Sequence, residues 1–122
     1  MERIWIGIGA LVGLGSVAMA AAAAHGLAAR LDPAALSAIR NGVQMQGWHA
    51  LALVLCGVWA ARGGVFVHAA AGCFVAGLLL FCGGVYGGAL TGLHFGMVAP
   101  AGGTLLMLGW GFLALSAFAR PR

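Results

Sequence analysis

The chain has 122 residues, of which 63% are hydrophobic and only 7% are charged, and its formal net charge at pH 7 is +4. Soluble domains carry roughly 25% charged residues, so this composition excludes a soluble globular protein and indicates a surface that faces lipid. The positive charge does not indicate nucleic-acid binding, because the arginines stand singly at the ends of apolar runs and form no basic cluster.

Four apolar runs follow one another along the chain, at about residues 4–24, 43–61, 65–90 and 101–118. A helix needs about 20 apolar residues to cross the hydrocarbon core of a bilayer, and each run meets or approaches that length. The runs are continuously apolar and lack the polar alternation of barrel strands. The sequence therefore predicts an all-α fold, in which a single domain forms an integral membrane bundle of four transmembrane helices.

A short surface helix is predicted after the first span. Asp32 is a suitable N-cap and Pro33 suits the first helical position, so the segment from Pro33 to Arg40 is expected to be helical. Asn41-Gly42 is a weak stop, which leaves open whether this helix continues into the second span. The other connections are the tight turn at residues 62–64 and a longer loop at residues 91–100.

The distribution of arginine predicts the orientation of the bundle. Four spans place the arginines at positions 3, 62, 120 and 122 on the side of both termini, and those at positions 30 and 40 on the opposite side. This asymmetry favours cytoplasmic termini. We expect the bacterial inner membrane as the location and the lipid bilayer as the main partner. A membrane-protein partner or a homo-oligomer remains open.

Glycine is abundant, with 22 residues, and several of these lie four positions apart within the spans. In lipid, helices associate through close backbone approach, which small residues at this spacing permit. We interpret the pairs as packing contacts within the bundle, with a self-association surface as the alternative. The pairs are Gly9 with Gly13, Gly83 with Gly87, and Gly84 with Gly88.

Polar side chains inside or beside the spans are the candidate functional residues. His25, Gln46, His49 and Tyr86 are all predicted to lie near the non-cytoplasmic face, with His49 roughly 10 Å into the membrane at about 1.5 Å per helical residue. Polar groups at membrane depth usually face the interior of the bundle. We therefore expect these four residues to form one cluster, in which His49 lies within hydrogen-bonding reach of at least one of the others.

Three interpretations of this cluster remain open. The first is a structural plug in which His49 bonds Gln46, Tyr86 or a backbone carbonyl. The second is a site for a small polar molecule, a quinone head group or a proton path. The third is a metal site formed by His25, His49 and His94, which no HxH or HxxxH spacing supports. The three cysteines form no CxxC pair, and no cofactor is expected.

Signatures of common enzyme chemistry are missing from the sequence. There is no lysine for a phosphate-binding loop, the acids Glu2 and Asp32 are terminal and loop residues, and no serine lies in a GxSxG motif. These observations favour a non-catalytic accessory or assembly-type membrane protein with a structural polar cluster. The alternative function is binding or transport of a small molecule, a quinone, protons or a metal through the region of His25, His49 and Tyr86.

A combination of short motifs resembles a known membrane protein family. The motifs are Ala24-His25-Gly26-Leu27, Gln46 with His49-Ala50-Leu51-Ala52-Leu53, Gly84-Val85-Tyr86 with Leu90-Thr91-Gly92, Pro100-Ala101-Gly102-Gly103, and Gly109-Trp110. On these residues the chain resembles domain-of-unknown-function family 423, the transmembrane protein 256-like small four-helix membrane proteins. The resemblance implies a compact four-helix membrane fold and no particular activity, and it adds weight to His25, Gln46, His49 and Tyr86 as a unit.

Overall fold

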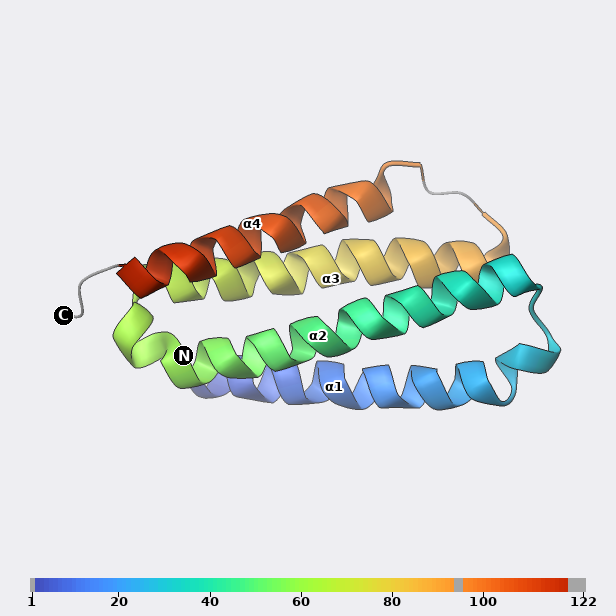
Figure 1. Cartoon of the computed structure of the whole chain (residues 1–122), viewed down its shortest axis with the longest axis horizontal. Helices are drawn as coiled ribbons and strands as arrows, with labels where there is room; N and C mark the ends of the chain where they lie inside the picture. Colours follow the sequence, from blue (N-terminus) through green and yellow to red (C-terminus); the bar gives the residue numbers. More distant parts are fainter. Residues whose placement is uncertain (1, 94–95, 119–122) are drawn as a thin grey trace.

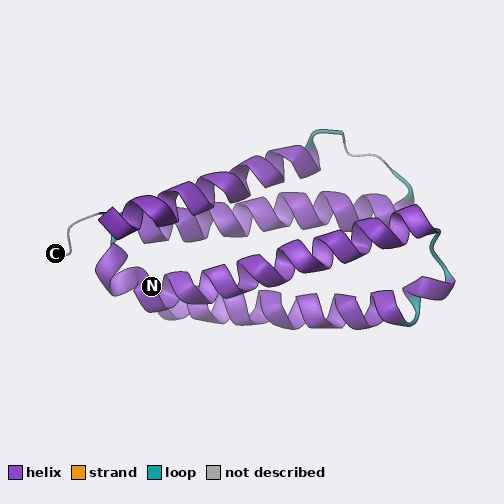
Figure 2. Ribbon diagram, viewed as in Figure 1, coloured by secondary structure: helices purple, strands orange, loops and turns teal. Residues whose placement is uncertain are grey.

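The computed structural model describes residues 2–93 and 96–118, and the regular structure within them is entirely helical (Figures 1 and 2). Four long helices lie side by side in one bundle with their axes roughly aligned, and consecutive helices run in opposite directions. The start of α1 therefore lies at the same end as the end of α4 (Figure 1). This arrangement confirms the predicted all-α bundle. The elements are α1 (Glu2–Ala24), the 3₁₀ helix η1 (Leu27–Ala29), α2 (Pro33–Gly63), α3 (Val65–Thr91) and α4 (Val98–Phe118).

Three of the four long helices are apolar enough over a sufficient length to cross a membrane: α1 extended through η1, α3 and α4. The remaining helix, α2, is the longest at 31 residues and lies alongside them. It carries Arg40, Gln46 and His49, which make it less apolar than its neighbours. The four predicted spans thus correspond to four helices, of which three qualify by length and composition alone.

The helix predicted to start at Pro33 is present, but it is not a separate surface element. Asp32 caps it as expected, since its Oδ1 accepts a hydrogen bond from the backbone N–H of Ala35 at 2.7 Å, and Pro33 occupies the first turn. The helix then continues through Asn41-Gly42 into the second span. Gly42 is retained inside the helix because the ring of Tyr86 fills the space where a Cβ would be, at 2.5 Å from Cε1.

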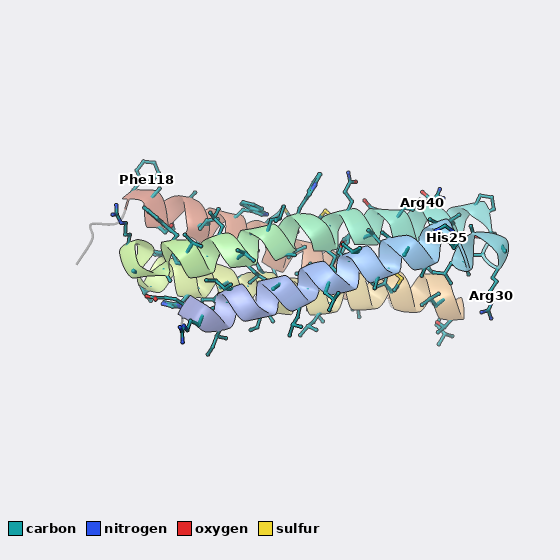
Figure 3. The ribbon with its side chains drawn as sticks, turned by 90° about the horizontal axis from the view of Figure 1, so that it is seen from below. His25, Arg30, Arg40 and Phe118 are labelled. Carbon is teal, nitrogen blue, oxygen red and sulfur yellow. The ribbon has the colours of Figure 1, made fainter. Side chains whose placement is uncertain are left out.

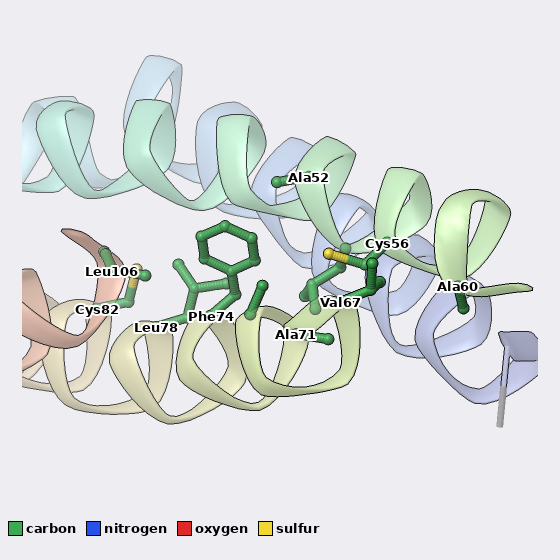
Figure 4. Packing of buried hydrophobic residues seen from close by; sticks show 11 residues of the cluster. Ala52, Cys56, Ala60, Val67, Ala71, Phe74, Leu78, Cys82 and Leu106 are labelled. Atoms are coloured by element: carbon green, nitrogen blue, oxygen red, sulfur yellow. The ribbon is translucent and has the colours of Figure 1, made fainter. Parts of the chain in front are cut away.

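The helices pack as two hairpins, α1 with α2 and α3 with α4, which are joined through α2 and α3. The main core lies between α2 and α3, where Phe74, Leu53, Cys56 and Val67 are fully buried (Figure 4). Leu106 of α4, in the same hairpin as α3, completes this core. Many large apolar side chains point outward from the bundle, as expected of a surface in contact with lipid.

Helices α3 and α4 cross closely at glycines spaced seven residues apart. A Cβ built on Gly77 would lie 2.9 Å from the carbonyl oxygen of Gly102, and one on Gly109 would lie 2.6 Å from the ring of Phe74. Gly84 also faces α4, because its Cβ would lie 3.1 Å from the amide nitrogen of Ala99. These contacts are possible only because glycine has no side chain, which lets the backbones of α3 and α4 approach each other directly.

The glycine pairs expected from the sequence contribute unequally to packing. Gly9 allows close approach of α1 to α2, since its Cβ would lie 2.8 Å from the carbonyl oxygen of Ala50, whereas Gly13 has only an ordinary contact there. Gly88 faces the backbone of Leu93, in the connection after its own helix, rather than a neighbouring helix. Gly83 has open space around its Cβ position. The spacing correctly predicted interhelical packing at Gly9 and Gly84. It did not predict the weaker contacts of Gly13 and Gly88, which lie four residues further along.

Candidate functional site

Gln46 and Tyr86 form a hydrogen-bonded pair that connects three helices. The Tyr86 hydroxyl donates to Gln46 Oε1 at 2.8 Å, and Gln46 Nε2 donates to the carbonyl oxygen of Val12 on α1 at 3.0 Å. The absence of a side chain at Gly15 leaves room for the Gln46 amide, whose Nε2 would be 2.9 Å from a Cβ there. The pair therefore fixes the relative heights of α1, α2 and α3, whereas the sequence interpretation places His49 at the centre of such a cluster.

His49 is nearly fully buried, with 3% of its surface exposed, and both of its ring nitrogens are hydrogen-bonded. The Trp110 indole N–H donates to Nε2 at 3.0 Å, and Nδ1 lies 2.6 Å from the carbonyl oxygen of Met45. Indole is only a donor and a carbonyl only an acceptor, so the geometry assigns the hydrogen of the imidazole to Nδ1. The rings of Phe74 and Trp110 pack edge-on against the imidazole, with centroids at 5.4 and 5.7 Å.

The four-residue cluster expected from the sequence divides into separate parts. Gln46 and Tyr86 bond each other, whereas the hydrogen bonds of His49 go to Met45 and Trp110. His25 is exposed at the end of the bundle that also carries Arg30 and Arg40, opposite the end at Phe118 (Figure 3).

Within the part of the chain that the structure describes, no three His, Cys, Asp or Glu side chains are grouped to hold a metal ion. His94, the third histidine of the candidate metal set, lies outside that part.

Tryptophan side chains supply interhelical hydrogen bonds that the sequence interpretation missed. The Trp5 indole N–H on α1 donates to His68 Nδ1 on α3 at 2.9 Å, and that of Trp59 on α2 donates to Ser116 Oγ on α4 at 3.0 Å. With Trp110, three indoles thus join helices outside the most extensive packing contacts. The signal for Trp110 was its position in the middle of a span, where an indole N–H needs a partner within the protein.

A groove with a volume of about 360 Å³ lies between α1, α2 and α3. Its walls are mainly apolar and include Ile8 and Val12 of α1 and Val75 of α3, while Gln46 and Tyr86 are its polar members. Leu79, which is 71% exposed, and Gly83 stand at its mouth. The groove therefore opens sideways, in the direction in which the bundle faces lipid.

Among the described residues, no buried side-chain nitrogen or oxygen lacks a hydrogen-bond partner. A catalytic or proton-transferring group needs a free position from which to act on a substrate. His49 has none in this conformation, because both of its nitrogens are used within the protein.

Comparison with known proteins agrees with the family resemblance noted from the motifs. Residues 19–103 match the family described as "Protein of unknown function (DUF423)". The chain is 34% identical to a UPF0382 membrane protein of Haemophilus influenzae, over 97% of this chain and 96% of that protein. It is 33% identical to a UPF0382 membrane protein of Staphylococcus haemolyticus and 32% identical to one of Staphylococcus aureus, in both cases over 95% of this chain and 96% of the relative. No solved structure matches the chain. On the extent of these matches, the chain is a membrane protein that belongs to the DUF423 family.

Proposed function

We propose that the protein is a non-catalytic accessory or assembly-type membrane protein, whose buried polar groups hold the bundle together. The observation that carries this proposal is the pairing of His49. It is the most deeply buried of the candidate residues that the structure describes, and its ring is hydrogen-bonded to Met45 and Trp110 with aromatic side chains around it. A buried imidazole with both nitrogens bonded stabilises one arrangement of helices, and it offers nothing to a substrate.

Binding or transport through a joint site of His25, His49 and Tyr86 has less support. Such a site requires the three side chains to converge, whereas His25 is exposed at the bundle end and His49 is bonded to α4. Assembly, in contrast, uses the outer surface. Large exposed apolar side chains such as Phe118, which is 86% exposed, provide one suited to lipid and to other transmembrane helices.

The proposed location is the bacterial inner membrane, with both termini in the cytoplasm. The start of α1 and the end of α4 lie at one end of the bundle, together with the α2–α3 turn (Figure 1), and Arg62 lies in the last turn of α2 before that turn. Arg30 and Arg40 lie at the other end (Figure 3). The sequence-based count of arginines, which includes Arg120 and Arg122 outside the described residues, supports this orientation.

Affinity capture from native membranes in a mild detergent tests the proposed role. We expect a membrane protein, or a second copy of the chain, to co-purify at a fixed ratio. The same ratio is expected for His49→Leu, because the association uses the outer surface rather than the buried imidazole. Tyr86→Phe serves as a second variant that keeps the aromatic packing. The proposal is refuted if wild-type protein carries no such partner but holds a metal or small molecule that His49→Leu loses.

A further inference from the structure

The groove between α1 and α3 has the length of one lipid leaflet. Its wall on α3 extends from Val75 to Tyr86, which are eleven residues apart and therefore about 16 Å apart along the helix at 1.5 Å per residue. The hydrocarbon core of a bilayer is about 30 Å thick, so one leaflet contributes about 15 Å. An extended hydrocarbon chain lying along the helices would thus fill the groove from the membrane surface to the midplane.

The polar end of the groove is the end nearer the membrane surface. Tyr86 packs against Gly42, and the exposed Arg40 lies two residues before Gly42 on α2. Gln46 also lines this end, and its amide nitrogen carries two hydrogens, of which one is donated to Val12. The second hydrogen is a donor at the depth where the polar part of a lipid begins.

We propose that this groove binds one acyl chain of a membrane phospholipid, from the leaflet on the side of Arg40, with an ester carbonyl accepting a hydrogen bond from Gln46. The mouth at Leu79 and Gly83 opens sideways, so a chain enters directly from the bilayer. The walls offer apolar contacts along the whole chain and polar contacts only at its outer end. This site is additional to the accessory role and does not depend on it.

Substitution at Gly83 fills the groove without disturbing the helix packing. A Cβ there has no atom within 4 Å, so Gly83→Leu places its side chain in the open space of the groove. Gly72→Leu is the matched control, because Gly72 also has no atom within 4 Å, is exposed on the same helix and does not line the groove. Leu79→Trp, at the mouth, is a second blocking variant.

The test uses the full chain in vesicles of phosphatidylethanolamine and phosphatidylglycerol that contain a phosphatidylethanolamine with a photoreactive diazirine in its acyl chain. After irradiation, labelled peptides are quantified by mass spectrometry. We expect labelling of residues 75–86 to exceed that of the other lipid-facing helix surfaces, to fall several-fold in Gly83→Leu and Leu79→Trp, and to be unchanged in Gly72→Leu.

Three results would overturn the proposal. The first is equal labelling of residues 75–86 in wild type, Gly83→Leu and Gly72→Leu, which would mean that the groove holds no lipid chain. The second is an isoprenoid lipid retained by the wild-type protein and released by Gly83→Leu, as observed by native mass spectrometry. The third is a crosslink between two copies of the chain through a photoreactive amino acid placed at Leu79 in a separate experiment, which would identify the groove as a contact between protomers.

Discussion

Replacing Gly102 with alanine should destabilise the bundle more than any other single methyl group added to α4. The new Cβ would collide with the backbone of α3, at the amide nitrogen of Phe81 and 2.7 Å from the carbonyl oxygen of Gly77. Carbon atoms pack at about 3.5–4.0 Å, so α4 must move away from α3 by about 1 Å. A gap of that size removes a quarter to a half of the dispersion energy of the contacts concerned, including those of Leu106.

The magnitude follows from comparing this change with Gly103→Ala on the adjacent residue. Overpacking typically costs about 1–3 kcal/mol. Both variants gain the same helix propensity, about 1 kcal/mol for alanine over glycine. A Cβ on Gly103 makes only an ordinary contact, 3.9 Å from the ring of Phe81, so the difference between the variants isolates the collision at Gly102.

The assay is reversible unfolding in mixed micelles with increasing sodium dodecyl sulfate, followed by tryptophan fluorescence. The expected difference in unfolding free energy between Gly102→Ala and Gly103→Ala is about 1–3 kcal/mol, which is about 5- to 150-fold in the folding equilibrium. If Gly102→Ala is as stable as Gly103→Ala, the two helices do not cross at this glycine, and the reasoning fails.

Three further predictions concern α2 and the chain ends. In a double-mutant cycle of His49→Leu and Trp110→Phe, the coupling free energy should be about 0.6 kcal/mol and at most about 1.7, as for other hydrogen bonds within membranes, and a value of zero would contradict the pairing. Asp32→Ala should lower the unfolding free energy by about 1 kcal/mol through loss of the N-cap, whereas Ser37→Ala, an exposed change on the same helix, should have little effect, and equal effects would argue against the cap. A reporter fused to the C-terminus should be active only in the cytoplasm, and activity confined to the other side would reverse the proposed topology.

The helices could be predicted from the sequence because each physical signal for them is local. Apolar length defines the spans, and the cap at Asp32 with Pro33 in the first turn defines the start of α2. Continuity through Gly42 could not be predicted in the same way. A glycine inside a helix is tolerated here because Tyr86, 44 positions later in the chain, occupies its space, and that contact depends on tertiary packing.

The candidate site was only partly predictable, for a related reason. Gln46 and Tyr86 could be placed near the same bundle end from residue counts, but they bond each other rather than His49. The partner of His49 was missed because the rotation of α4 about its axis is set by glycine contacts with α3, which turn Trp110 toward α2. Depth in the membrane can be estimated from residue counts, whereas helix rotation depends on which small residues meet.

The bond between Trp110 and His49 also has a consequence for biosynthesis. The two residues are 61 positions apart, so at about 5–20 residues per second the ribosome delivers Trp110 about 3–12 s after His49. During that interval the rest of α2 and all of α3 are made, while Nε2 of the imidazole does not yet have the Trp110 indole to bond. A nascent chain truncated before α4 would therefore keep an unpaired polar group within its second helix.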